Sequence, residues 1–191
     1  GLWGWALSRF SGSWVAFKAI TETVESGRSF VPPLVPDFNL PPEALLQHRR
    51  EYSAREFLSP AIEERMLQRL EAVRLFSRHH PLDRLLDHAP HARLGVISVG
   101  KAALDAEKAI AQLRQQHPQL PAIRHLQVGL VWPLDLGTVQ QFALGLDHLL
   151  VIEEKTSLVE EQIKDYFYNR ADRPSVHGRH AADGSVLVPS S

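Results

Sequence analysis

The alternation of apolar and polar positions is clearest between Arg93 and Phe167. Three short stretches typical of strands alternate there with three segments in which apolar residues recur every three to four positions. The stretches cover 93–99, 123–128 and 149–152, and the periodic segments cover 101–117, 138–149 and 157–167. The last run is apolar throughout, as expected of a strand covered on both faces. Alternating strands and helices of this length predict an α/β fold, a three-layer sandwich with a mainly parallel sheet and right-handed crossovers.

Two of these predicted helices begin with the spacing of a capping box. Thr138 precedes Gln141 by three residues, and Ser157 precedes Glu160 by three. In a capping box the hydroxyl and the longer polar side chain each bind a free backbone amide. The sequence therefore predicts helix starts at these two serine or threonine positions.

The flanking regions carry different patterns. A helix is predicted over residues 13–25, with Trp14, Phe17, Ile20 and Val24 on one face. An extended linker is predicted over residues 32–60, because five prolines fall between positions 32 and 42. A helix is predicted from Ser59-Pro60 to His80, and a second, short one over 82–89. We expect this pair to cover a face or edge of the sheet. After Phe167 the pattern fades into short extended pieces.

Composition limits the class of protein. The chain has 191 residues, a formal net charge of −1 and 44% hydrophobic residues, which suits a globular protein of one domain or one domain with appendages. Near-neutral charge argues against a nucleic-acid surface, and no run approaches the roughly 18 apolar residues of a membrane span. The chain starts at Gly1 without methionine, so we expect a piece of a longer polypeptide.

The chain contains no cysteine. Disulfides, thiolate zinc sites and cysteine-ligated iron–sulfur clusters are therefore excluded within these residues. The absence also fits a reducing compartment.

Three stretches within the alternating region resemble a known enzyme family. The run 94–105 is similar to the first strand–helix unit of the second domain of 2-oxoacid:ferredoxin oxidoreductases, and indolepyruvate ferredoxin oxidoreductase resembles it most. Residues 128–134 and 150–155 resemble that family's next two signatures, in order and at the right distances. Such domains are related to the C-terminal domain of transketolase.

The resemblance implies a domain organisation. Residues 1–31 are interpreted as the tail of a preceding pyrimidine-binding domain, which 8–12 and 17–26 resemble, although an ordinary N-terminal helix packed on the core is the other interpretation. Residues 32–60 are the Pro-rich linker, 61–179 the transketolase C-terminal-like domain with its leading helices, and 180–191 a C-terminal tail or linker.

The resemblance also implies a function. The parent would be a cytoplasmic enzyme that uses thiamine diphosphate with Mg²⁺, [4Fe–4S] clusters and coenzyme A as co-substrate. It would oxidatively decarboxylate a 2-oxoacid to an acyl-CoA and pass the electrons to ferredoxin. This chain would be a structural interdomain unit in contact with the enzyme's other domains and with a second copy in a homodimer.

The catalytic parts of such an enzyme are missing from the sequence. The Gly-Asp-Gly motif that binds the diphosphate through a metal ion is absent, so we expect no catalytic residue, cofactor or metal ligand in this fragment and no activity from it alone. Two other hypotheses remain: the equivalent domain of another thiamine enzyme, such as a 2-oxoacid dehydrogenase or transketolase, and a free-standing flavodoxin-like ligand-binding module.

Gly100-Lys101 is the candidate anion site. It follows a strand and opens a helix, where free amides and the helix dipole favour an anion. The spacing does not match a P-loop, because Ala102 stands where a serine or threonine is needed. The favoured interpretation is that Gly100 permits a tight turn, while Lys101 meets an acidic group of a neighbouring domain.

Other polar groups carry weaker predictions. Glu153-Glu154-Lys155 ends a strand, where α/β sheets place their ligands, but neighbours on a strand point to opposite faces, so ion pairs at a domain contact are favoured over shared acid–base chemistry. The ten histidines show no partner at a recognisable spacing and are expected to be exposed.

Overall fold

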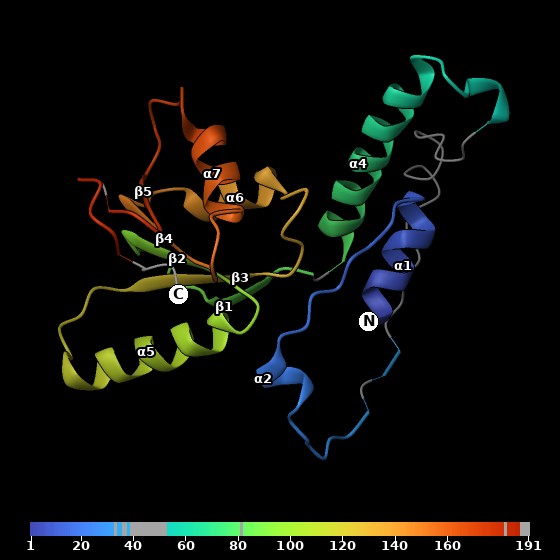
Figure 1. Ribbon diagram of the computed structural model, residues 1–191. Helices are drawn as coiled ribbons and strands as arrows, with labels where there is room; N and C mark the ends of the chain where they lie inside the picture. The colour runs from blue at the N-terminus through green and yellow to red at the C-terminus, as the bar shows by residue number, and fades with distance from the viewer. Residues whose placement is uncertain (33, 36–37, 39–52, 81, 182, 188–191) are drawn as a thin grey trace. The chain divides into compact units, whose positions relative to one another are not determined.

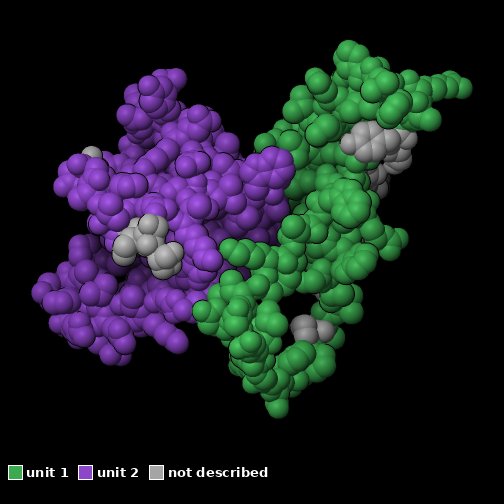
Figure 2. All heavy atoms as spheres, in the orientation of Figure 1, with its two compact units in different colours: residues 1–80 green, residues 81–191 purple. Residues whose placement is uncertain are grey.

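The computed structural model describes residues 1–32, 34–35, 38, 53–80, 82–181 and 183–187. These residues form two compact units, 1–80 and 81–191, which are coloured separately in Figure 2. Most of the predicted linker at 32–60 lies outside the described residues. No helix in the described ranges is long and apolar enough to cross a membrane.

The first unit is built on two packed helices. Its elements are α1 (Leu2–Ser11), α2 (Thr21–Val24), the 3₁₀ helix η1 (Ala54–Glu56) and α4 (Ala61–His79). Helix α1 packs on α4 through aromatic rings: the centroids of Trp3 and Phe10 lie 6.1 and 5.7 Å from that of Phe76, which is fully buried. The predicted helix from Ser59-Pro60 is confirmed as α4.

The predicted helix over 13–25 is wrong. Helix α1 ends earlier, at Gly12, whose φ of 71° places it in the left-handed region, and only 21–24 return to a helix. The cause is local, because the Ser11 hydroxyl donates to the Leu7 carbonyl and accepts the Ser13 amide, which closes the end of the helix. The apolar stripe of the predicted helix also lacks support, since Trp14 is fully exposed.

The second unit is an α/β sandwich around a five-stranded sheet. Its strands are β1 (Arg84–Asp87), β2 (Leu94–Val99), β3 (Ile123–Val128), β4 (His148–Ile152) and β5 (Ser175–His177), and its helices are α5 (Ala102–Gln116), α6 (Leu136–Ala143) and α7 (Val159–Phe167). The strand order is β1-β3-β2-β4-β5. All neighbours are parallel except β1, which runs antiparallel to β3.

Helices cover both faces of this sheet, with α5 on one face and α6 and α7 on the other (Figure 1). Alternate strand residues separate the two cores, as the pleat requires. Ile97 of β2 packs in the cluster that holds α6 and α7, whereas its neighbour Val96 packs with Ala106 and Ile110 of α5. The predicted α/β fold with a mainly parallel sheet is therefore confirmed.

The short helix predicted over 82–89 is wrong, because this segment contains strand β1. Its residues pair with β3, with Leu85 opposite Leu126. A short apolar run has no periodicity long enough to separate helix from strand, so pairing at the sheet edge decided its conformation. The segment is thus a strand at the edge of the sheet and not a helix that covers it.

The predicted start at Thr138 of the helix over 138–149 is also wrong. Helix α6 begins at Leu136, two residues earlier, with Asp135 in the capping position. The Thr138 hydroxyl donates to the Asp135 carboxylate over 2.7 Å, and this carboxylate makes no capping hydrogen bond to an amide of α6. Asp135 is 2% exposed, a site where a hydrogen-bonded carboxylate is tolerated.

Candidate functional site at the carboxyl edge of the sheet

The carboxyl ends of β2, β3 and β4 lie at one edge of the sheet, because these strands are parallel and adjacent. Open α/β sheets bind ligands at this edge. Gly100 and Lys101 follow β2, and Glu153 follows β4, the strand that pairs with β2. The structure therefore brings the two predicted groups of polar residues to neighbouring strand ends.

Gly100 has the backbone conformation that its turn needs. Its φ is +57°, in the left-handed region that glycine adopts at low cost. A Cβ at this position would meet nothing within 4 Å, so the requirement is on the backbone and not on space. The predicted role of Gly100 in the strand-to-helix turn is confirmed.

Lys101 binds within its own helix. Its ammonium lies 2.9 Å from the Asp105 carboxylate one turn further along α5, and the Ala103 and Leu104 amides bind the carbonyls of Gly100 and Lys101. The anion site at Gly100-Lys101 and the contact with a neighbouring domain both stay predictions.

Glu153 serves as the cap of α7. One carboxylate oxygen accepts the amides of Leu158 and Val159 over 3.1 and 2.9 Å, and the other accepts the amide of Glu160 over 2.9 Å. A helix N-terminus offers free amides and a partial positive charge, and here the chain fills that place with its own carboxylate. The role of Glu153 thus differs from the predicted ion pair at a domain contact, and it replaces the predicted capping box from Ser157.

Glu160 is a buried carboxylate with a full set of partners. It is 2% exposed and accepts the Ser157 hydroxyl over 3.0 Å, the Arg179 amide over 2.9 Å and the Lys164 ammonium. Burial by itself raises the pKa of Glu160, but the hydrogen bonds from Arg179, Lys164 and Ser157 outweigh it and hold the pKa below its ordinary value. Glu160 is therefore an anion that joins α7 to the C-terminal segment.

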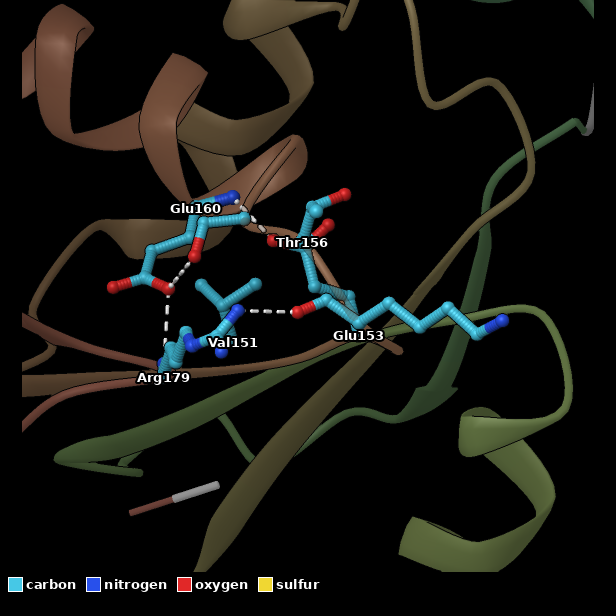
Figure 3. Close-up of a pocket in the computed structure, with 7 residues that line it drawn as sticks. Val151, Glu153, Thr156, Glu160 and Arg179 are labelled. Atoms are coloured by element: carbon cyan, nitrogen blue, oxygen red, sulfur yellow. Dashed lines mark hydrogen bonds between the residues drawn. The ribbon is translucent and has the colours of Figure 1, made fainter. Parts of the chain in front are cut away.

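These residues enclose only a small cavity, shown in Figure 3. Its free volume is about 10 Å³, close to the room for a single water molecule. The Arg179 guanidinium closes one side by donating to the Lys155 carbonyl over 2.6 Å. The lining residues are Val151, Glu153, Lys155, Thr156, Ser157, Glu160 and Arg179. The site around Glu160 is thus filled by the chain's own side chains.

The comparisons with known proteins decide the family. A family model described as an indolepyruvate oxidoreductase domain matches residues 84–191, more than half of the chain. The chain belongs to this family. The match begins at the first strand of the second unit and includes the whole sheet.

Curated relatives of this indolepyruvate oxidoreductase domain are longer proteins. The chain is 26% identical over 114 residues to indolepyruvate oxidoreductase subunit IorA of Thermococcus kodakarensis, covering 60% of this chain and 17% of the relative. It is 25% identical to the same subunit of Pyrococcus abyssi, with the same coverage, and 25% identical to that of Methanothermobacter marburgensis, covering 63% and 18%. The chain therefore spans less than a fifth of the length of these relatives.

One solved structure is similar to part of the chain. It is a 2-oxoglutarate:ferredoxin oxidoreductase from Magnetococcus marinus, solved with 2-oxoglutarate, coenzyme A and succinyl-CoA bound, with a TM-score of 0.47 and 16% identity. The similarity covers 63% of this chain and 20% of that chain.

A further carboxylate, which the sequence interpretation did not find, lies at the same edge of the sheet. Asp83, just before β1, accepts the amides of Gly129 and Leu130 over 2.8 and 3.4 Å at the end of β3. Burial raises the pKa of Asp83, and these two hydrogen bonds lower it only in part. The sequence signal for this contact is Gly129, the glycine that directly follows β3. The structure requires a glycine there, since a Cβ would meet the Leu82 carbonyl oxygen at 2.1 Å.

A buried serine–histidine pair lies under α5, on the same sheet face as Val96. The Ser98 hydroxyl and the His125 Nε2 are 2.7 Å apart, and the two residues are 0% and 1% exposed. Burial lowers the pKa of His125 below its ordinary value of 6.5, against the weaker opposing influence of Glu107 and Asp87. This histidine departs from the predicted exposed position, because its neighbours on β2 and α5 cover it.

Proposed function

We propose that this chain includes the second domain of a thiamine-diphosphate-dependent indolepyruvate or related 2-oxoacid ferredoxin oxidoreductase, and that the domain is a structural connection between other domains. The observation that carries the proposal is the family match over 84–191. Such an enzyme decarboxylates a 2-oxoacid on thiamine diphosphate, passes electrons through [4Fe–4S] clusters to ferredoxin and releases an acyl-CoA.

The residues of this chain do not fit the cofactors of such an enzyme. Thiolates hold iron–sulfur clusters, and none of the 191 residues is a cysteine. The Gly-Asp-Gly motif for thiamine diphosphate and Mg²⁺ is also absent from the sequence. On this proposal the ligands of both groups, and the binding of coenzyme A, belong to other parts of the parent polypeptide or to a partner subunit.

The hydrogen bonds of the charged side chains at the carboxyl edge of the sheet support a structural role. Glu153 neutralises the start of α7, and Glu160 binds the backbone of the C-terminal segment. Hydrogen-bonded carboxylates of this kind hold loops and helix ends in place. The proposal includes contacts with the parent's other domains, a homodimer, ferredoxin as the parent's partner and a cytoplasmic location.

The experiment that tests the proposal compares the chain with the complete polypeptide that contains it. The complete protein, assembled with its partner subunit, is expected to reduce a viologen dye when given indolepyruvate or another 2-oxoacid with coenzyme A. The isolated chain is expected to give no such reduction. Calorimetry is expected to show no heat of thiamine-diphosphate binding to it, and its spectrum is expected to lack the broad absorbance of iron–sulfur clusters near about 400 nm. A complete protein without 2-oxoacid-dependent reduction would contradict the proposed function, and cofactor binding by the isolated chain would contradict the structural role.

A further inference from the structure

Two histidines meet across the last pair of strands in the sheet. The Nδ1 of His148 and the Nε2 of His177 are 3.2 Å apart, and their ring centroids are separated by 5.4 Å. His148 begins β4 and His177 ends β5. The strand register pairs His148 with Ser175 and Leu150 with His177, so the histidines are diagonal neighbours two residues apart on one face.

The spacing of these nitrogens suits one metal ion. Two imidazole nitrogens bound to a tetrahedral Zn²⁺ at about 2.0–2.1 Å lie about 3.3–3.4 Å apart. A square-planar ion would bring them to about 2.8 Å. The observed 3.2 Å between His148 and His177 is nearer the tetrahedral value, and a metal would replace the single proton that the two nitrogens share in their hydrogen bond.

The surroundings leave the pair accessible. His148 is exposed and His177 is half-buried, so an ion reaches the two nitrogens from solvent. Both oxygens of the neighbouring Asp147 carboxylate already accept hydrogen bonds from the Arg93 guanidinium, through its Nε and one terminal nitrogen. In the part of the chain that the structure describes, no group of three or more His, Cys, Asp or Glu side chains is placed to hold a metal, so the remaining coordination positions fall to water or to a group from another chain.

We infer that His148 and His177 form a two-histidine zinc site that fastens β5 onto β4. Strand β5 is only three residues long and leads directly to Gly178 and Arg179, the residues that meet Glu160. A metal bridge at this place would hold the beginning of the C-terminal segment, while Glu160 holds the next two residues. The site does not depend on the proposed enzymatic function, because it lies at the opposite end of β4 from the carboxyl edge.

Zinc binding to the chelator-treated 191-residue chain tests this inference. Calorimetry is expected to find one zinc per chain, and the affinity is expected to fall about tenfold or more in His148→Asn and in His177→Asn, because each variant loses the chelate. His117→Asn, at an exposed position beyond α5, is the matched control and is expected to keep the wild-type affinity. Equal zinc affinity in all four proteins would overturn the site.

A second measurement does not depend on the variants folding. Two-bond ¹H–¹⁵N spectra of the wild-type imidazoles are expected to show zinc at Nδ1 of His148 and at Nε2 of His177, and hydrogen exchange at the amides of 175–177 is expected to slow when zinc is added. Zinc-induced changes at other imidazoles only, or unchanged exchange in β5, would refute the proposed bridge.

Discussion

The Glu160 carboxylate lies beside Gly178 in the space that any other residue would fill with its Cβ. A Cβ built on Gly178 would stand 2.4 Å from the Cδ and one oxygen of Glu160. This contact lets the adjacent Arg179 amide reach the same carboxylate over 2.9 Å. The glycine and the glutamate therefore form one unit, which attaches the C-terminal segment to α7.

Gly178→Ala is expected to destabilise the second unit by about 1–3 kcal/mol, the usual cost of overpacking a filled site. The methyl group would push the Glu160 carboxylate away from the Arg179 amide and leave both groups with poorer hydrogen bonds. Urea unfolding followed by circular dichroism measures the change. Gly27→Ala is the control, because a Cβ there would meet nothing within 4 Å; equal midpoints for the two variants would contradict the packing argument.

Glu160→Gln is expected to remove part of the chain's acid sensitivity. Because the folded pKa of Glu160 lies below its ordinary value of 4.5, the ionised carboxylate stabilises the fold above that value, and this contribution is lost as pH falls through the lower folded pKa. The variant is expected to be less stable at neutral pH and to show a flatter loss of stability below about pH 4.5. Unfolding midpoints over this range test it, with the exposed Glu161→Gln as the matched neighbour. A wild-type slope in Glu160→Gln would refute the assignment.

His125 is expected to make the fold less stable as pH falls below about 6.5. Burial lowers its pKa in the folded chain, so the unfolded chain takes up a proton at a pH where the folded chain does not, and protons favour unfolding. His125→Gln, which keeps a partner for the Ser98 hydroxyl, is expected to lose stability less steeply between about pH 7 and pH 5. His117→Gln, an exposed histidine, serves as the control, and identical slopes in all three proteins would show that His125 does not titrate in this way.

Gly100→Val is expected to lower stability by about 1–3 kcal/mol, since a β-branched residue is strained at a φ of +57°. Lys101→Ala changes the next residue and is expected to cost less than about 1 kcal/mol, because its ion pair with Asp105 is exposed. Thermal melting of both variants separates backbone strain from charge. Equal melting temperatures for Gly100→Val and the wild type would contradict the turn argument.

The first unit is expected to self-associate through its exposed aromatic residues. Trp3 packs on Phe76, but Trp5, Trp14 and Phe17 are 75%, 100% and 79% exposed. Large exposed apolar side chains close in the sequence mark interaction surfaces, and a symmetric dimer is the simplest way to bury them.

Sedimentation at high micromolar concentration tests this expectation. The triple variant Trp5→Gln, Trp14→Gln, Phe17→Gln is expected to be monomeric, whereas Trp132→Gln, which removes an exposed tryptophan of the second unit, is expected to behave like the wild type. A wild-type chain that stays monomeric would rule out self-association through these residues.

Periodicity predicted the architecture of the second unit because it depends on regular, local features. Strands covered on both faces need continuous apolar runs, and 149–152 has one. The helices need apolar residues every three to four positions, which α5 and α7 have. The turn at Gly100 was also predictable, since a glycine between a strand and a helix indicates a backbone requirement.

Contacts between distant residues decided the remainder. Residues 84–87 became a strand through pairing with β3, where Leu85 lies opposite Leu126. Glu153 caps α7 from five to seven residues away, and Glu160 meets Gly178 across 18 positions of sequence. The pattern of apolar and polar residues determined the layers, because burial acts on each segment's own periodicity; the partner of each polar side chain was decided only when folding brought separate strands and loops to the same edge of the sheet.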